Sequence, residues 1–406
     1  MRSLLKIPTA IIFLLLTVCS WAVMSQAGFA DTLYVATNGN NQRSRSQAQN
    51  RSTPWQTIQR ACNQARPGDE VVVLPGQYNQ NVRIKKSGQA GREITIRSER
   101  HHGARLFGSF TIQDQSYVTI TGFDITNSNS SGQTKGIDFV RCHHVTVRTC
   151  RVRDCFGGGI GFDQSDWILC EWNIVHHNAF FNLDQHSGIS VYQPQYRGND
   201  DRRFGVIIRN NTCFNNRNFV NNINFGRPTD GNGIVVDDYF NEQQPTGNGV
   251  RYDRETTIEN NLCYDNGGQG IHCFMSQNIR IRNNTCSNNL ASFDFGGEVS
   301  VVESERVYVY NNILISAPNR FAAFQFDSSE VLFFFNLFDG PTREIDFDVS
   351  NRRGNARFIR DTFRPSSTSP ARNGGFDTGD HFSLGVTGET RFNGPLDIGA
   401  IESRFE

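Results

Sequence analysis

Acid and base side chains recur at fixed distances after a repeated Gly-Ile pair in the middle of the chain. These pairs begin at Gly136, Gly159, Gly188, Gly233 and Gly270. Side chains alternate between the two faces of a β-strand, so an inward isoleucine places the second and fourth residues after each glycine on the outer face. The outer positions include Asp163, Ser190, Tyr192, Asp237 and His272. Carboxylate, phenol and imidazole groups on one face are typical of a site that transfers protons.

The candidate bases can be ranked by their titration range, because imidazole titrates closer to neutral pH than phenol or carboxylate does. His272 is the first candidate, Tyr192 the second, and His186, two residues before a Gly-Ile pair, is the third. No lysine falls at an outer position of the pattern, so none is expected on this face. A second set of residues is expected to bind substrate: Asp163, Ser190, Arg202 and Arg203.

Carboxylates are concentrated between residues 230 and 238. Asp230, Asp237 and Asp238 offer the hard oxygen ligands that Ca²⁺ prefers, so calcium is a candidate cofactor. Removal of a proton next to a sugar carboxylate needs a cation or an arginine, which neutralises the negative charge that develops. The alternative interpretation is that these residues only form the solvated face of a sheet.

An asparagine repeat indicates the elements that position these residues. The doublet Asn-Asn recurs at 210–211, 260–261, 283–284 and 311–312. Short strands recur around these doublets with almost no helical periodicity, which favours a solenoid of stacked parallel strands. Equivalent positions on neighbouring coils lie about 4.8 Å apart, so the asparagines are expected to bond to one another in ladders. The cysteines that follow are expected to be buried as small apolar residues: Cys213, Cys263 and Cys286.

A solenoid needs a cover at each end, because its terminal coils would otherwise expose the core. Residues 53–66 are expected to form a short amphipathic capping helix with Thr53 as its N-cap. Residues 341–406 have weak periodicity and are expected to wrap or cap the other end, with 396–402 as the last strand. The predicted fold is therefore all-β, a parallel β-helix with a short N-terminal capping helix.

Residues 1–30 have the form of a secretory signal peptide, because Arg2 and Lys6 precede an apolar run that small residues follow. Val18 before Cys19 is bulkier than lipoprotein processing requires, so a lipid anchor is not expected. Three segments are predicted: the signal peptide 1–30, the β-helix with its cap 31–340, and a C-terminal coil and cap 341–406.

The charge of the chain bears on its partners. Its 40 basic and 40 acidic residues become a small acidic excess when the leader is lost, so nucleic acid is not an expected partner. The mature chain has no further apolar run that could span a membrane. We therefore expect a secreted or periplasmic monomer.

Several stretches of the sequence have a familiar form: TPWQTIQRACNQARPGDEVVVLPGQYNQNVRI with GREITIRSE, DGNGIVVDD, NNLCYDNGGQGIHCFMSQNIRIRNNTCSNN and DIGAIE. They resemble the secreted right-handed parallel β-helix proteins of the pectate lyase-like group. That group contains the pectate lyases of family nine, the alginate and dermatan lyases of family six, and the mannuronan epimerases. The resemblance covers nearly the whole mature chain, and it implies a right-handed helix and a carbohydrate substrate.

Two departures prevent any one activity from being carried over from this group. Family nine lyases have a catalytic lysine directly after a Gly-Asn-Gly-aromatic motif, whereas here the segment 231–234 is followed by Val235. The epimerase signature Asp-Pro-His-Asp is also absent from the sequence. Since members of such a fold share a scaffold and differ in a few groove residues, the activity depends on the site itself.

The leading hypothesis is an exported enzyme that acts on an acidic polysaccharide by β-elimination at a uronate. Coils spaced by about 4.8 Å give the outer face a length of roughly 15 Å, which suits several sugar units. A C5-epimerase or a glycoside hydrolase on the same groove is the second hypothesis, with Asp163 and Asp237 as the carboxylate pair for hydrolysis. The third is a β-helix that binds glycans without catalysis.

Overall fold

The structure is a computed structural model that describes residues 30–128, 134–198, 204–293, 295–360, 362–377, 379, 384–388 and 395–403. The predicted signal peptide lies outside these residues except for its last position. Two short helices precede or interrupt the first coils: α1 (Arg45–Ala48) and α2 (Ile58–Gln64). Neither helix has the length and apolar character that a bilayer-crossing helix requires, and the described chain contains no other that does.

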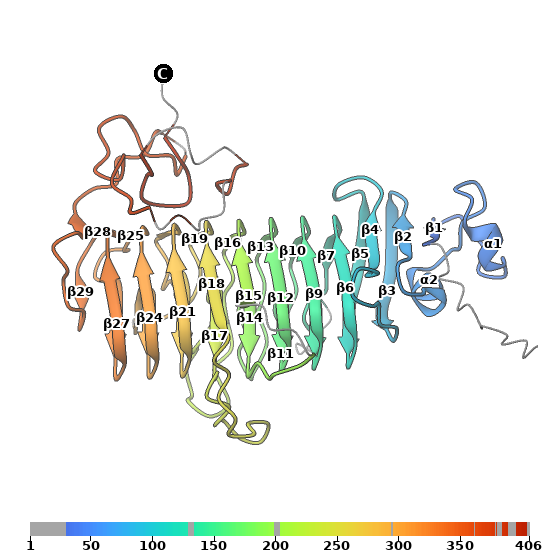
Figure 1. Ribbon diagram of the computed structural model, residues 1–406, viewed down its shortest axis with the longest axis horizontal. Helices are drawn as coiled ribbons and strands as arrows, with labels where there is room; N and C mark the ends of the chain where they lie inside the picture. Colours follow the sequence, from blue (N-terminus) through green and yellow to red (C-terminus); the bar gives the residue numbers. More distant parts are fainter. Residues whose placement is uncertain are drawn as a thin grey trace, which may run out of the picture.

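The chain winds into a right-handed parallel β-helix whose coils stack along the long axis of the molecule (Figure 1). Each regular coil adds one strand to each of three parallel ladders. The first ladder is a separate sheet of strands: β1 (Thr32–Val35), β2 (Glu70–Val73), β4 (Ile94–Ser98), β6 (Ser116–Thr121), β9 (His143–Arg148), β12 (Asp166–Glu171), β15 (Phe204–Arg209), β18 (Glu255–Glu259), β21 (Gln277–Arg282), β24 (Glu305–Tyr310) and β27 (Ser329–Phe334).

The other two ladders join through the long strands β3 (Gly76–Ile84) and β5 (Ala104–Gln113), because β5 pairs with both β7 and β8. One ladder consists of β7 (Asp124–Thr126), β10 (Arg151–Arg153), β13 (Ile174–His176), β16 (Thr212–Phe214), β19 (Leu262–Tyr264), β22 (Thr285–Ser287), β25 (Ile313–Ile315), β28 (Leu337–Asp339) and β30 (Arg352–Arg353). The other, called here the groove ladder, consists of β8 (Ile137–Val140), β11 (Ile160–Asp163), β14 (Ile189–Tyr192), β17 (Ile234–Asp237), β20 (Ile271–Phe274), β23 (Gly297–Val302), β26 (Phe321–Phe326) and β29 (Thr342–Arg343).

Stacked aliphatic side chains fill the interior of the helix. The isoleucines of the Gly-Ile pairs form one such column along the groove ladder: Ile137, Ile160, Ile189, Ile234 and Ile271, each at most 1% exposed. Burying one such side chain contributes about 1.5–3 kcal/mol relative to leaving it in water. The predicted cysteines occupy the matching column of the neighbouring ladder and are fully buried, as expected.

Two asparagine ladders run through the core, as predicted from the repeat. The side-chain amide of each ladder asparagine donates to the amide oxygen of the next, from Asn173 through 211, 261, 284, 312 and 336 to Asn351. A second ladder runs from Asn178 through 216 and 266 to Asn289. It ends on the carboxylate of Glu298, which accepts both the backbone and the side-chain N–H of Asn289.

The first asparagine of each doublet has a separate role at the corner of the coil. Asn210, Asn260, Asn283 and Asn311 have φ between 54° and 56°, a left-handed conformation that asparagine tolerates better than most residues. The glycines of three Gly-Ile pairs, Gly188, Gly233 and Gly270, make room for the second ladder. A Cβ at Gly188 would lie 2.7 Å from Nδ2 of Asn216, so a larger residue would displace the ladder.

The N-terminal cap is shorter than predicted. Helix α2 begins after Thr57, whose side chain accepts the N–H of Arg60, and not after Thr53. Residues 54–57 are extended because Trp55 pairs with the first sheet, donating its N–H to the carbonyl of Tyr34. The short helix α1, with Ser44 as its N-cap, was not predicted.

The C-terminal segment lies along the side of the helix next to β16 to β28 (Figure 1). Residues 395–403 form no strand, so the prediction of a last strand at 396–402 is wrong. The segment is held instead by packing and by single hydrogen bonds. Ile398 packs against Ile313 and Leu337, and the N–H of Gly399 donates to the carbonyl of Asn311.

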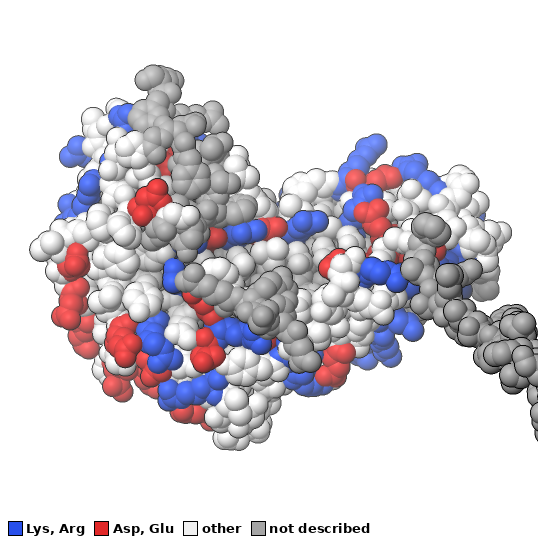
Figure 2. All heavy atoms as spheres, in the orientation of Figure 1, with Lys and Arg blue, Asp and Glu red and all other residues white. Residues whose placement is uncertain are grey.

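Opposite charges are interleaved on the face that the first sheet presents (Figure 2). Several arginines of this sheet pair with glutamates one coil earlier, as in Arg209 with Glu171 and Arg282 with Glu259. The strands of this face are therefore joined by ionic contacts across the coils in addition to their backbone hydrogen bonds.

Candidate functional site

The outer positions of the groove ladder lie in two straight rows, in the register expected from the sequence. One row carries Asp138, Gly161, Ser190, Val235 and His272 on successive coils. The other carries Val140, Asp163, Tyr192, Asp237 and Phe274. Neighbouring members of a row sit directly opposite one another on paired strands, so their side chains face the same space.

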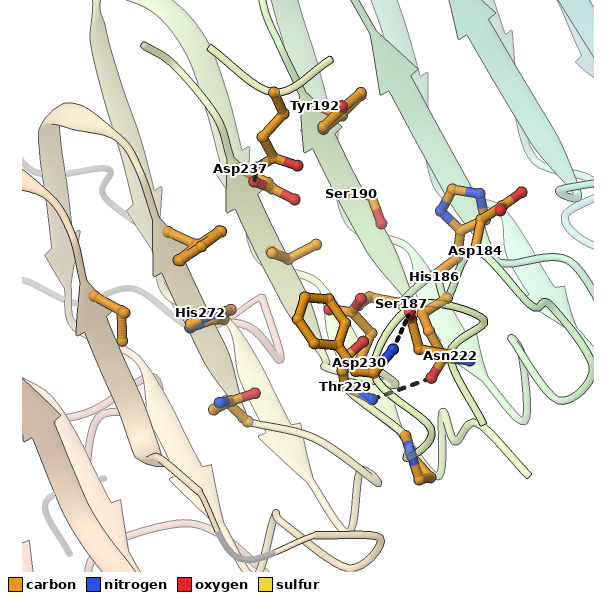
Figure 3. Close-up of a pocket in the computed structure, with 18 of the residues that line it drawn as sticks. Asp184, His186, Ser187, Ser190, Tyr192, Asn222, Thr229, Asp230, Asp237 and His272 are labelled. Carbon is orange, nitrogen blue, oxygen red and sulfur yellow. Dashed lines mark hydrogen bonds between the residues drawn. The ribbon is translucent and has the colours of Figure 1, made fainter. Parts of the chain in front are cut away.

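A pocket of about 750 Å³ opens over β14, β17 and β20 and is the structure's candidate site. Ser190, Tyr192, Asp237 and His272 reach it from the strands (Figure 3). Several loops add to its wall, among them one around 184–187 with His186 and one around 222–230 with Asp230. The pocket therefore brings together all three candidate bases, one candidate substrate-binding residue and two of the candidate metal ligands.

The two imidazoles of the pocket are neutral over most of the pH range. Burial lowers the pKa of His272 to about 4, against a small opposing effect of the Ser300 backbone. Burial, together with the nearby charge of Lys135, lowers the pKa of His186 to about 3. Nδ1 of His272 is buried and has no hydrogen-bond partner among the described residues. A neutral imidazole can act as a base toward a ligand that reaches one of its ring nitrogens.

Tyr192 is placed between carboxylates, since it pairs with Asp163 on one side and Asp237 on the other. Burial raises the pKa of Tyr192 to about 12; a hydrogen bond with Thr246 opposes this rise, and the charges of Asp237, Asp238 and Asp163 add to it. The phenol therefore keeps its proton at neutral pH, and it is better suited to donate a proton than to remove one.

Asp230 and Asp237 are two half-buried carboxyl groups in the pocket. Burial raises the pKa of Asp230 to about 6, although Asn232 donates to Oδ1 at 2.8 Å. Burial and then the charge of Asp230 hold the pKa of Asp237 well above its usual range, while Gln243 donates to its Oδ1 at 2.8 Å. Both carboxyl groups are thus easier to protonate than a free aspartate, and Asp237 is subject to the charge of Asp230 as well as to burial.

Asp238, the third predicted metal ligand, does not reach the pocket. Its two oxygens accept the backbone N–H groups of Glu242 and Gln243 and the side-chain amide of Gln193. It comes directly after β17 with φ of 51°, and this turn directs it into the loop that follows. Among the residues that the structure describes, no three His, Cys, Asp or Glu side chains lie close enough to hold one metal ion. The described side chains therefore do not form the predicted calcium site by themselves, and calcium binding stays a prediction.

Lys135 lies on the groove face, although no lysine was expected there. Its Nζ donates to Asp138 at 2.9 Å and to Asp163 at 2.7 Å, and its side chain is 5% exposed. The chain of the lysine crosses Gly161, where a Cβ would lie 2.4 Å from Cδ of Lys135. Burial alone would lower the pKa of Lys135, but the two carboxylates outweigh burial and raise it. Lys135 is therefore a fixed cation, and Asp163 is its partner.

We expect Lys135→Ala to lower the free energy of unfolding by about 3 kcal/mol, because it leaves two neighbouring carboxylates without their cation. Thermal and denaturant unfolding followed by circular dichroism measure this loss. Lys86→Ala is the control, since Lys86 is exposed. Equal stability of the two variants would contradict a structural role for Lys135.

The predicted substrate-binding residues Arg202 and Arg203 fall outside the described residues. The outward row His176, Phe214 and Tyr264 stacks with ring centroids 4.6 and 4.9 Å apart on the neighbouring ladder. Phe363 of the C-terminal segment covers the end of this row at 5.1 Å from Tyr264.

Comparisons with known proteins agree with this architecture. Residues 33–202 match the family described as Pel9A-like, right handed beta helix region. The protein named Uncharacterized protein YwoF, from Bacillus subtilis (strain 168), is 25% identical over 120 residues, which are 27% of this chain and 25% of that protein. The chain thus aligns with about a quarter of the length of that relative.

Solved structures match over more of the chain. The crystal structure of pectate lyase Pel9A aligns with a TM-score of 0.57 and 17% identity, covering 93% of this chain and 97% of that one. A structure titled Glycoside hydrolase aligns with a TM-score of 0.54 and 10% identity, covering 80% and 95%. The complex of XylC with xylose aligns with a TM-score of 0.52 and 12% identity, covering 77% and 69%. In its fold, and in the sequence of residues 33–202, the chain resembles the right-handed parallel β-helix proteins of the pectate lyase-like group.

Proposed function

We propose that the protein is an exported enzyme that cleaves a uronate-containing polysaccharide by β-elimination. The observation that carries the proposal is the position of His272, a neutral imidazole with an unused nitrogen, in the same pocket as the protonated phenol of Tyr192. Elimination needs a base for the proton next to the carboxyl group and an acid for the leaving oxygen. The similarity in fold to a pectate lyase supports the same chemistry.

His272 is the base of the proposed reaction and Tyr192 is its acid. His272 lies two strands along the groove ladder from Tyr192, with β17 between them, so a sugar bound over β17 has one group on each side. Gln243, which already donates to Asp237, and Ser190 supply polar contacts within the pocket. These contacts orient the sugar, while the side chains of the two loops limit the access of water.

Hydrolysis of a glycosidic bond is the second candidate, and the pair Asp230 and Asp237 favours it. A hydrolase uses one protonated carboxyl group as acid and one ionised carboxylate as base or nucleophile. The pair Asp230 and Asp237 suits this division better than Asp163 and Asp237 do, because the pKa values of Asp230 and Asp237 are both raised, whereas Asp163 is paired with Lys135.

One assay with two readouts separates the candidates. The protein is incubated with pectin, pectate, alginate and a glycosaminoglycan, with calcium and with chelator, and both new reducing ends and the absorbance of unsaturated uronates are followed. Elimination produces both signals together. Hydrolysis produces reducing ends without the absorbance. In that case Asp237→Asn should abolish the release of reducing ends.

The proposed function fails if no polymer yields unsaturated product. Binding of a polymer without either signal would indicate a glycan-binding β-helix, and a change in sugar composition without cleavage would indicate an epimerase. A signal that requires calcium and disappears in Asp230→Asn would support the predicted calcium site.

A further inference from the structure

The pocket changes character along the axis of the helix. The row that carries Tyr192 and Asp237 continues in register with Phe274, Val302 and Phe326 on the next coils. All of these residues line the pocket. One end of the pocket is therefore polar, the other is a wall of apolar side chains, and His272 on β20 stands where the two meet.

Further phenylalanines extend the apolar wall. Phe293 and Phe295 line the pocket from the loop before β23. The ring of Phe295 packs edge-on against Phe324 of β26, with centroids 4.9 Å apart. Phe326 is 42% exposed although it is apolar, so a ligand at this end of the pocket would bury a ring that now faces water.

The charge of the pocket is negative. Asp184, Asp230, Asp237 and Glu303 line it, and Arg227 is the one lysine or arginine among the described residues of its wall. Asp230 and Asp237 already repel each other, and the nearby Lys135 is held by two aspartates of its own. A sugar carboxylate placed here would add like charge to a partly desolvated site, whereas an uncharged group would not.

We propose that the pocket takes a uronate whose carboxyl group is esterified, with the alkyl group of the ester against Phe274 and Phe326. This inference rests on the proposed function, because it specifies the substrate of the same elimination. The apolar wall provides a surface for the alkyl group, and the acidic lining disfavours a charged carboxyl group at this position.

An ester also removes one demand that elimination makes on the protein. The ester carbonyl is neutral and withdraws electrons from the adjacent C–H bond, so the site has no sugar carboxylate to neutralise. His272 takes the proton from carbon 5, the electrons of that bond form the double bond between carbons 4 and 5, and the bond from carbon 4 to the leaving oxygen breaks. Tyr192 protonates that oxygen, and return of a proton from His272 to Tyr192 through solvent restores both groups.

The test compares two polymers that differ only in the ester. The absorbance of unsaturated product is followed with highly methyl-esterified pectin and with pectate made by de-esterifying the same pectin. We expect kcat/KM to be at least about 10-fold higher for the esterified polymer, which is the discrimination that a small apolar group in a fitted pocket provides. An equal or higher value for pectate would overturn the inference and leave elimination standing. No unsaturated product from either polymer, nor from alginate, would overturn the proposed function and the inference with it.

A matched pair of variants ties the preference to the apolar wall. Phe326→Ala should lower kcat/KM on the esterified polymer at least about 5-fold more than on pectate. Phe107→Ala is the control, because Phe107 is also 42% exposed but stands on β5, away from the pocket. An equal loss on both polymers, or a loss in the control as large as in Phe326→Ala, would overturn the role given to the wall.

Discussion

His272→Ala is expected to lower kcat for release of unsaturated product by about 10²–10⁴-fold, the usual contribution of a general base. The residue lies between the polar and apolar ends of the pocket, and its Nδ1 is the ring nitrogen left without a partner among the described residues. Tyr192 and Lys135 do not replace it as base, because the phenol of Tyr192 keeps its proton at neutral pH and Lys135 is a fixed cation. Initial rates from the absorbance of unsaturated product measure the effect.

His176→Ala is a matched control for this variant. Burial lowers the pKa of His176 to about 4, as it does for His272, but His176 stacks on Phe214 on a different ladder. Its loss should leave kcat within about 2-fold of the parent, because it touches no residue of the pocket. Retention of more than a tenth of the parent rate by His272→Ala, with its circular dichroism unchanged, would contradict the assignment.

The pH profile gives an independent check on the same base. His272 acts as base only in its neutral form, and its pKa is about 4. The value of kcat/KM should therefore be constant on the alkaline side and fall as pH decreases through about 4. A fall centred near the ordinary imidazole value would show that another group is the base.

Asn284→Ala is expected to have the largest effect on stability, lowering the free energy of unfolding by about 4 kcal/mol. Nδ2 of Asn284 donates to the carbonyls of Ile258 and Arg282 and to Oδ1 of Asn312. Its own Oδ1 accepts two N–H groups of Asn261. Alanine would remove these five buried hydrogen bonds, most of them between neighbouring coils, and the backbone N–H of Asn261 would lose its partner. Denaturant unfolding followed by circular dichroism measures the loss.

Asn221→Ala is the control for the ladder, because Asn221 is exposed in a loop. Its free energy of unfolding should stay within about 0.5 kcal/mol of the parent. If the two variants were equally stable, the amide ladder would contribute little beyond the backbone hydrogen bonds of the sheets.

The fold could be predicted from the sequence because the solenoid repeats one local pattern. Inward isoleucines after glycine and one asparagine per corner fix the register of each coil on the next, so the pattern predicts that Ser190 and His272 share one outer face, and the strand pairing confirms it. The capping helix was predicted in the right region, but its start was wrong. Propensity favoured Thr53 as N-cap, whereas the pairing of Trp55 with the first sheet keeps that stretch extended.

The site was harder to predict, because several of its side chains do not follow strand alternation. Lys135 precedes its strand and reaches the groove by crossing Gly161, an outer position that has no side chain of its own. Asp238 has the carboxylate group that a metal ligand needs, but a left-handed turn directs its side chain into the loop. The sequence signal for Lys135 was Gly161, an outer position without a side chain that lies beside Asp138 and Asp163.

The buried cysteines make the opening of this protein measurable coil by coil. Nine unpaired thiols lie inside the described solenoid, from Cys62 of the capping helix to Cys286 near its far end. Burial raises the pKa of Cys150 and Cys155 to about 12, so these thiols are both shielded and protonated in the folded state. An alkylating reagent can modify such a group only after its coil separates from its neighbours. Mass spectrometry of partly labelled protein would therefore give the order in which the coils unzip, and from which end.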